Sequence, residues 1–211
     1  PCGSGNGLAN SAKISKQPLS ALKTVFNGTP VETDGFLVND RFACMLCGLG
    51  YDAKVAYDFA TQPKRGLATY AKMALKNFFS MKPHPFTLQL QNKKIETSAW
   101  FMSIANSNQF GNNFTIAPKA SLSDGLLDIV IVTSKSKIGF VLQTLKQLAG
   151  WNKLQTTTVE KDKNAVLYFQ TDKLTIYNPS LAPLHIDGDP TETSEKIWIE
   201  VKKKCFRLLQ P

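Results

Sequence analysis

Arginine, histidine and long apolar runs are scarce in this sequence of 211 residues. Three arginines accompany 22 lysines, and they are Arg41, Arg65 and Arg207. Because arginine most often reads base edges and phosphates, this shortage disfavours a nucleic-acid-binding module, even at a net charge of +9. No run approaches the roughly 18 apolar residues that a membrane span requires. The amino terminus also lacks the charged-then-apolar pattern of a secretory signal.

Cysteine is sparse as well. The four cysteines, Cys2, Cys44, Cys47 and Cys205, are too few and too scattered for a disulfide framework, which favours a reducing, cytoplasmic setting. Cys44 and Cys47 form a Cys-x-x-Cys pair, but no second pair and no nearby histidine accompany it. We therefore expect no metal or redox centre at this pair.

The positive charge comes mainly from lysine, and it has two interpretations. Lysine spread over a surface suits loose attraction to an anionic membrane surface. It suits equally well a solvated surface that keeps the protein soluble. The sequence leaves both interpretations open.

Short apolar runs bounded by turn residues dominate the chain from residue 31 onward. They lie at 35–38, 42–49, 86–90, 96–105, 127–133, 165–170, 173–177 and 196–209. Turns separate most of them, rather than regular crossover helices. This pattern predicts a mainly β protein in which antiparallel sheets pack face to face as a β-sandwich. With 43% apolar residues, the chain can bury one substantial core.

Two helices are predicted to be inserted among the strands, over residues 65–81 and 138–149, because apolar side chains recur there at helical spacing. These side chains include Leu75, Phe79, Val141, Leu142, Leu145 and Leu148. Such a stripe could line a lipid-entry groove. Packing of the stripe against the sandwich is the favoured interpretation.

The first eleven residues, Pro-Cys-Gly-Ser-Gly-Asn-Gly-Leu-Ala-Asn-Ser, form a glycine-rich turn. Two short helices are predicted after it, at 8–16 and 19–26. Bare backbone N–H groups at a helix start can hold an anion. The turn lacks the spacing of a dinucleotide-binding fingerprint and the Gly-Lys-Ser/Thr of a Walker loop, so a plain surface turn is the alternative.

Five short strings resemble, in the same order, motifs of the diacylglycerol kinase and sphingosine kinase family of lipid kinases. They are Pro-Cys-Gly-Ser-Gly-Asn-Gly-Leu-Ala at 1–9, Cys-Gly-Leu-Gly-Tyr-Asp-Ala-Lys-Val at 47–55, Ala-Asn-Ser-Asn-Gln-Phe-Gly at 105–111 followed by Ile-Ala-Pro-Lys-Ala at 116–120, Asp-Gly-Leu-Leu-Asp at 124–128, and Ile-Asp-Gly-Asp-Pro at 186–190. Each string is common by chance, but their joint order over nearly the whole chain is not. The resemblance implies transfer of the γ-phosphoryl group of ATP, with Mg²⁺, to a hydroxyl of a membrane lipid such as diacylglycerol or a sphingoid base.

The resemblance also assigns roles to three acidic residues. It implies that Asp189 is the general base that takes the proton of the lipid hydroxyl. Asp187 would orient the turn or contact the nucleotide, and Asp52 would contact the polar head of the lipid. Without the resemblance, Asp187 belongs to an ordinary Asp-Gly turn and Asp52 to a strand end facing water. His84 and His185 look too isolated to take part in catalysis.

Two further sites are implied by the resemblance. Asp124 would bind a structural Mg²⁺ together with the main-chain carbonyls of Ser121 and Leu126, and oxygen-only ligation suits this hard cation. Asp128 alternates to the other side of its predicted strand and is left out of the site. Without the resemblance, Asp124 belongs to a β-turn. The implied nucleotide-binding residues are Gly3, Ser4, Gly5, Asn6 and Asp187.

The sequence departs from the family pattern at three places. Many bacterial diacylglycerol kinases have an acidic residue where this chain has Gly7, whereas sphingosine kinases tend to have a small one. The glutamate of the last motif is here Asp189, one methylene shorter. The family's Gly-Gly-Asp-Gly-Thr phosphate-binding motif is absent, and the resemblance places it upstream of residue 1. We therefore expect residues 1–30 to be a remnant of the nucleotide domain, residues 31–211 to form the sandwich, and the fragment alone to be inactive.

One rival function is a non-catalytic lipid-binding protein on the same scaffold, which Gly7 and Asp189 favour. NAD kinases share the upstream nucleotide motif and a comparable two-domain plan, but the downstream strings resemble the lipid kinases more closely. The expected location is cytoplasmic, with peripheral attachment to an anionic membrane. The sequence does not decide between a monomer and a homodimer.

Overall fold

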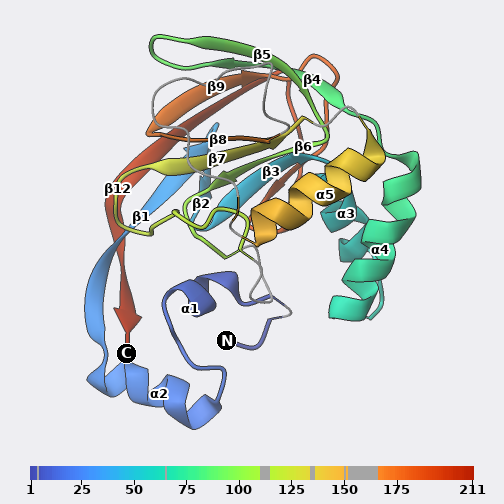
Figure 1. The fold of residues 1–211 in the computed structure, drawn as a ribbon. Coiled ribbons are helices and arrows are strands. Elements are labelled where there is room, and N and C mark those ends of the chain that lie inside the picture. Colours follow the sequence, from blue (N-terminus) through green and yellow to red (C-terminus); the bar gives the residue numbers. More distant parts are fainter. Residues whose placement is uncertain (4, 65, 110–114, 134–135, 150, 152–165) are drawn as a thin grey trace.

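The computed structural model describes residues 1–211 except 4, 65, 110–114, 134–135, 150 and 152–165. It shows two antiparallel sheets packed face to face, which confirms the predicted mainly β sandwich (Figure 1). The helices are α1 (Gly7–Ser11), α2 (Pro18–Asn27), α3 (Tyr51–Ala60), α4 (Leu67–Ser80) and α5 (Lys137–Leu148). The strands are β1 (Thr29–Val38), β2 (Arg41–Ala43), β3 (Leu46–Gly50), β4 (His84–Gln89), β5 (Lys94–Ala99), β6 (Phe101–Ala105), β7 (Leu127–Val132), β8 (Val166–Thr171), β9 (Lys173–Tyr177), β10 (Leu184–Ile186), β11 (Asp189–Thr191) and β12 (Lys196–Gln210).

Each sheet has six strands within the described residues. The first has the order β2-β1-β12-β9-β4-β5 and the second the order β11-β10-β3-β6-β7-β8. Their inner faces meet in a core of branched aliphatic side chains that alternate inward along each strand. Fully buried members include Leu88, Ile104, Ile129, Ile176 and Ile197. Each such side chain contributes roughly 1.5–3 kcal/mol of burial free energy, so this core is what fixes the sheets to each other.

Two predicted strands are in fact divided between the sheets. The run at 42–49 gives β2 in the first sheet and β3 in the second, joined through Cys44 and Met45. The run at 96–105 gives β5 and β6, with Trp100 at the bend. The Trp100 N–H donates to the carbonyl of Val132 at 2.9 Å, so the bend itself stays hydrogen-bonded. Apolar periodicity alone does not show such a change of sheet.

Helix α3 was not predicted as a helix. It follows β3 directly, because Gly50 takes a φ of 93° that turns the chain out of the strand. Asp52 lies in its first turn, where a negative charge complements the helix dipole. The Tyr51 hydroxyl donates to the Ala74 carbonyl at 2.6 Å, and the Asn77 amide donates to an Asp58 oxygen at 2.9 Å. These bonds fix α4 against α3.

The apolar stripes of α4 and α5 face the sandwich only in part. Phe78 of α4 and Leu148 of α5 pack against a buried cluster, as predicted. Helix α5 packs through Phe140, whose ring lies 5.4 to 5.9 Å from the rings of Tyr51, Trp100 and Phe101. Residues of both predicted stripes are exposed instead, and they are Leu75, Phe79, Val141, Leu142 and Leu145. The prediction of inward packing for these residues is wrong, because periodicity defines a stripe without showing which way it turns.

The amino-terminal segment lies at one end of the sandwich, near the carboxyl end of β12 (Figure 1). Helix α1 covers five residues, fewer than predicted, while α2 matches its predicted position. Assignment of residues 1–30 to a separate nucleotide domain stays a prediction. Every helix in the described part of the chain is too short or too polar to cross a membrane.

Candidate functional site

The hairpin between β10 and β11 turns at Asp187 and Gly188, whose φ angles of 51° and 91° fit a two-residue type I′ turn. Oδ1 of Asp187 accepts hydrogen bonds from the backbone N–H groups of Met45 (2.9 Å) and Leu46 (3.0 Å). Oδ2 accepts from the N–H of Cys44 at 2.9 Å and from its thiol at 3.2 Å. Burial, with the nearby Asp187 charge, raises the pKa of Cys44 to about 12. Asp187 therefore anchors the hairpin to the crossing between β2 and β3.

Asp189 directly follows this anchored turn and is exposed. Its backbone pairs with Ile186 across the hairpin, so the position of the residue is fixed. Among the described residues, no hydrogen bond or ion pair engages its carboxylate. A free carboxylate on a rigid turn suits a general base, because both of its oxygens stay available for a substrate proton.

Asp52 and His185 form a buried pair beside the same turn. Their side chains are 6% and 4% exposed, and His185 Nε2 lies 3.3 Å from Asp52 Oδ2. The Gly188 N–H donates to His185 Nδ1 at 3.3 Å, so the neutral ring carries its proton on Nε2 and donates it to Asp52. Two sequence-based interpretations are therefore wrong: His185 is not isolated, and Asp52 is not at a strand end facing water. Helix α3, the element that was missed, is what brings Asp52 to His185.

Gly48 on β3 makes room for this pair. A Cβ at this position would lie 2.1 Å from Asp52 Oδ2 and 2.4 Å from His185 Nε2. Both contacts are far below van der Waals separation, so only glycine allows the two side chains to meet over the strand. The glycine spacing of the 47–55 string thus has a packing reason here.

Asp124 lies on the loop before β7 and is exposed. Its Oδ1 accepts a hydrogen bond from the Leu126 N–H at 3.0 Å, which closes a local turn. Partial burial raises the pKa of Asp124, helped by the charge of Asp34. Oδ2 has no recorded partner among the described residues, and the main-chain carbonyls of Ser121 and Leu126 are on the same loop. One carboxylate oxygen with main-chain carbonyls fits Mg²⁺, which keeps several waters and needs few protein ligands.

A buried chain of hydrogen bonds joins the Asp124 loop to the Asp187 turn. Asp34 on β1 accepts from the N–H of Gly125 at 2.7 Å and from the N–H of Lys204 at 2.6 Å. The Asn106 amide donates to the carbonyls of Asp34 (2.8 Å) and Cys44 (3.0 Å). Cys44 in turn donates to the Asp187 carboxylate. Sequence reasoning missed Asp34, which directly precedes the predicted apolar run at 35–38.

The amino-terminal turn is closed by its own side chain. Asn6 accepts from the Gly3 N–H at 2.8 Å and donates to the Gly3 carbonyl at 2.7 Å. The Asn10 amide makes a longer bond, 3.4 Å, to the carbonyl of Gly5. Ser4 lies outside the described residues. The Gly3 N–H is thus already occupied, and a phosphate would have to displace the Asn6 side chain to use it.

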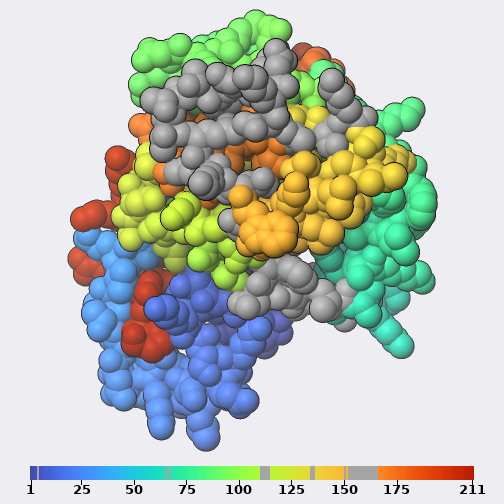
Figure 2. Space-filling model, viewed as in Figure 1, coloured from blue at the N-terminus to red at the C-terminus, as the bar shows by residue number. Residues whose placement is uncertain are grey.

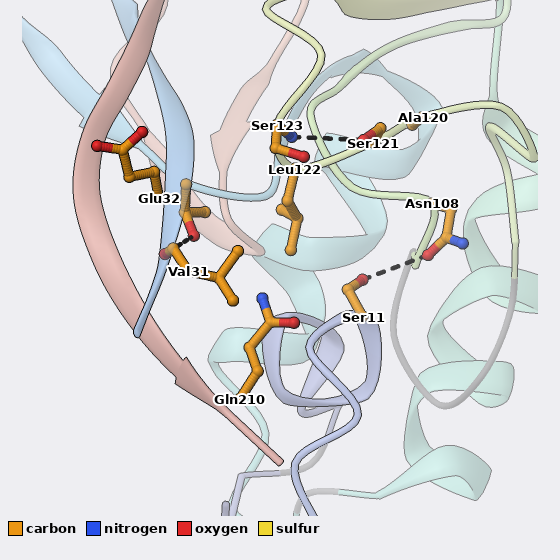
Figure 3. Close-up of a pocket in the computed structure, with 10 residues that line it drawn as sticks. Ser11, Val31, Glu32, Asn108, Ala120, Ser121, Leu122, Ser123 and Gln210 are labelled. Carbon is orange, nitrogen blue, oxygen red and sulfur yellow. Dashed lines mark hydrogen bonds between the residues drawn. The ribbon is translucent and has the colours of Figure 1, made fainter. Parts of the chain in front are cut away.

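A cavity of about 250 Å³ lies between α1, the start of β1, the loop at 120–123 and the end of β12. Val31, Leu122 and Gln210 point into it from three sides (Figure 3). Ser11 donates a hydrogen bond to Asn108 at 3.3 Å along its rim. The cavity adjoins the loop that carries Ser121, whereas Asp187 and Asp189 are not among its lining residues.

Comparison with known proteins agrees with this arrangement. Residues 46–194 match the model of the YegS C-terminal NAD kinase beta sandwich-like domain, which covers most of the chain. The chain belongs to this family. The match includes β3, α3 and the β10–β11 hairpin, the elements that carry Asp52 and Asp187. It confirms the resemblance to lipid kinases that the ordered motifs had indicated.

Curated relatives include "Probable lipid kinase YegS-like" of Shewanella frigidimarina, 26% identical over all of this chain and 66% of the relative. "Probable lipid kinase YegS" of Salmonella arizonae is 25% identical over all of this chain and 67% of the relative. A crystal structure of a diacylglycerol kinase from Bacillus anthracis superposes with a TM-score of 0.70 at 16% identity, over all of this chain and 65% of that one. This likeness shows the shared fold. The present YegS-family chain spans about two thirds of the length of these relatives.

Proposed function

We propose that this YegS-family chain is the carboxy-terminal part of an ATP-dependent lipid kinase. The protein would transfer the γ-phosphoryl group of ATP to a hydroxyl of a membrane lipid, such as diacylglycerol or a sphingoid base. The observation that carries the proposal is the Asp187–Asp189 hairpin, in which one carboxylate is consumed as an anchor and the next is left free. The names of the relatives support the same reaction class.

In this proposal Asp189 takes the proton of the lipid hydroxyl as its oxygen bonds to the γ-phosphorus of ATP. The bond from that phosphorus to the β–γ bridging oxygen breaks, and ADP leaves. The three backbone donors at Cys44, Met45 and Leu46 hold Asp187, and thereby the hairpin, in one position. That rigidity matters because a misplacement of about 1 Å can cost about 10²-fold in rate. Asp189 is a methylene shorter than glutamate, so the hydroxyl must approach the backbone closely or through a water.

The buried Asp52 is proposed to meet the polar head of the lipid. One of its oxygens accepts from the Ala53 N–H at 2.9 Å and the other from His185, so a head group would share these oxygens rather than find them free. His185 holds the Asp52 carboxylate in place and joins it to Gly188 on the catalytic hairpin. The head-group site and the proton acceptor are therefore parts of one hydrogen-bonded unit.

ATP would supply the phosphoryl group and Mg²⁺ would neutralise charge on it, as in other phosphoryl transfers. Asp124, with the carbonyls of Ser121 and Leu126, would hold a structural Mg²⁺. Gly3, Gly5 and Asn6 would lie against the nucleotide, after the Asn6 side chain has turned away from Gly3.

The test replaces Asp189 in the full-length protein and measures transfer of labelled phosphate to diacylglycerol and to sphingosine. Asp189→Asn keeps the shape but removes the basic oxygen, so turnover is expected to fall roughly 10²-fold or more with little change in ATP affinity. Full activity of Asp189→Asn would remove this residue from the mechanism.

A non-catalytic lipid-binding protein remains the second candidate. Gly7 favours it, because a Cβ there would lie 2.0 Å from Cε of Met45, leaving no space for the acidic residue of many bacterial diacylglycerol kinases unless Met45 moves. The shorter carboxylate of Asp189 favours it as well. The Asp189→Glu variant separates the two candidates. If the wild type is an active kinase, the activity of Asp189→Glu should be equal to or lower than that of the wild type. If the wild type is inactive and Asp189→Glu gains activity, the protein is a non-catalytic relative.

A further inference from the structure

Helix α5 turns its apolar stripe to the outside of the molecule. Ile138, Val141, Leu142 and Leu145 recur at a spacing of three or four residues and are all exposed, Ile138 by 76%. The opposite side of the helix is anchored by Phe140. A surface helix normally shows the reverse arrangement, with polar residues outward. In Figure 2, α5 lies at the surface of the face toward the viewer.

Helix α4 extends this surface. Leu75 and Phe79 are exposed, Phe79 by 71%. The Lys137 ammonium at the start of α5 donates to the Phe79 carbonyl and lies 5.7 Å from the centre of the Phe78 ring. The carboxyl end of α4 thus contacts the amino end of α5. We call Leu75, Phe79, Ile138, Val141, Leu142 and Leu145 the α4/α5 face.

The charges on these two helices are all of one sign. Lys72 and Lys76 on α4, and Lys137 and Lys146 on α5, are accompanied by no aspartate or glutamate in either helix. Helix α3, by contrast, carries Asp52 and Asp58. Exposed apolar residues combined only with lysine are typical of helices that lie in the interface of an anionic membrane.

Trp151 lies just beyond α5 and is 74% exposed. The backbone N–H of Trp151 donates to the Lys146 carbonyl at 3.0 Å, so the residue stays next to the last turn of the helix. Tryptophan prefers the membrane–water interface, where its ring meets acyl chains and its N–H meets water. Its position continues the α4/α5 face.

We propose that the α4/α5 face docks the protein on the surface of an anionic lipid bilayer, with the apolar side chains inserted and the lysines against the head groups. The proposal rests on the proposed function in so far as that function takes its acceptor from a membrane. Docking here would also place the lipid near Asp52, because the Tyr51 hydroxyl ties the start of α3 to Ala74 on α4.

The test measures sedimentation of the protein with vesicles of phosphatidylglycerol and phosphatidylcholine, and with vesicles of phosphatidylcholine alone. We expect clear preference for the anionic vesicles, weakened by salt. The double variant Leu142→Ser/Leu145→Ser should bind about tenfold or more weakly, since two apolar side chains no longer insert. Lys72→Glu/Lys76→Glu should also lose about tenfold or more on anionic vesicles. These side chains are exposed, so melting temperatures should stay close to that of the wild type.

A matched control changes two lysines elsewhere, Lys16→Glu/Lys196→Glu, with the same effect on net charge. It should retain most of the binding. Equal losses in both lysine pairs would show that only overall charge matters, and unchanged binding of the leucine pair would show that this face does not insert. If the wild type does not bind anionic vesicles but forms dimers, and the Leu142→Ser/Leu145→Ser variant is monomeric, the face binds a second copy of the chain. Each of these results overturns the proposal.

Fluorescence gives an independent measurement. Emission of the wild type should shift to shorter wavelength on anionic vesicles, and Trp151→Phe should remove most of that shift. No shift, or an undiminished shift in Trp151→Phe, contradicts docking through this end of α5.

None of these binding assays needs nucleotide. Docking without phosphoryl transfer would refute the proposed function alone, while transfer to detergent-dispersed lipid without vesicle binding would refute the docking alone.

Discussion

His185 and Asp52 lie 133 residues apart in sequence and meet over Gly48, with 3.3 Å between Nε2 and Oδ2. Neither side chain is exposed by more than a few per cent. A buried carboxylate with few partners is costly, so each residue of the pair depends on the other for its stability.

A double-mutant cycle tests this dependence. His185→Leu leaves the Asp52 carboxylate buried with one donor fewer, and should destabilise the protein by about 1–3 kcal/mol. Adding Asp52→Asn should then cost less than it does in the wild type, since the charge that needed His185 is gone. The free energies of unfolding of the four proteins, from urea titration, give the coupling. Strictly additive losses would mean that the two side chains do not interact.

The same substitution at the two aspartates of the hairpin should destabilise the protein at Asp187 and have little effect at Asp189. Asp187→Asn leaves a single acceptor oxygen for three backbone donors and should lower the free energy of unfolding by roughly 2–4 kcal/mol. Asp189→Asn, its matched control, lies on the surface and should change stability by less than about 0.5 kcal/mol. Thermal unfolding of both variants measures this difference. Similar losses in both would show that Asp187 is not the anchor.

Asp128 gives a pH dependence with a definite sign. Its carboxylate accepts from the Tyr168 hydroxyl at 2.6 Å and from the Gln170 amide at 2.9 Å. Burial nevertheless raises the pKa of Asp128 above its ordinary range, with those two bonds opposing the rise. The folded state therefore holds the proton more tightly than the unfolded state. Stability from this group is greatest at low pH and is lost as pH rises from about 4, the ordinary carboxyl value, through the raised folded-state value.

The variant Asp128→Asn should remove that part of the pH dependence. As pH rises through this window, the unfolding free energy of the wild type should fall relative to that of the variant. Urea titration at several pH values measures both free energies. Asp40→Asn, at an exposed position, serves as the control and should leave the profile unchanged. A wild-type-like profile in Asp128→Asn would contradict the assignment.

Magnesium should stabilise the wild type through Asp124. The Asn side chain of Asp124→Asn can still accept from the Leu126 N–H but has lost the charge that a hard cation requires. We expect the melting temperature of the wild type to rise with Mg²⁺ and to fall with chelator, and that of the variant to respond to neither. The same response in both proteins would return Asp124 to a simple turn.

Much of the fold was accessible from the sequence because the core strands carry strong apolar patterns ended by turn residues. The Asp-Gly turn at Asp187 was also predictable, since its φ angles favour those residues. The pairing of His185 with Asp52 was not, because it depends on α3 and on a contact between distant parts of the chain. Asp34 was missed for the same reason, as its partners Gly125 and Lys204 come from other elements.

The direction of the apolar stripes was the other failure. Sequence periodicity in α5 assigned Val141, Leu142, Leu145 and Leu148 to the interior. Leu148 does pack against the core, but the other three are exposed. The helix instead docks with Phe140, whose ring fills the space among the aromatic side chains beneath. Leu148 packs on the same side, and the buried Gln147 amide donates to the Ile116 carbonyl at 2.6 Å. These contacts hold the helix in place, and the remaining apolar residues are then free to serve a surface.

The passage of the chain from one sheet to the other at Cys44–Met45 and again at Trp100 has a consequence for motion. Two residues connect the sheets at Cys44–Met45, and one connects them at Trp100. Because these connections are so short, the sheets cannot slide or separate without breaking strand pairs in both sheets. Amide hydrogen exchange at β3 and β6 should therefore require global unfolding, because no local opening of lower free energy exposes these amides. The Asp187 anchor belongs to this cooperative unit, so local opening and closing must come from segments outside the sandwich.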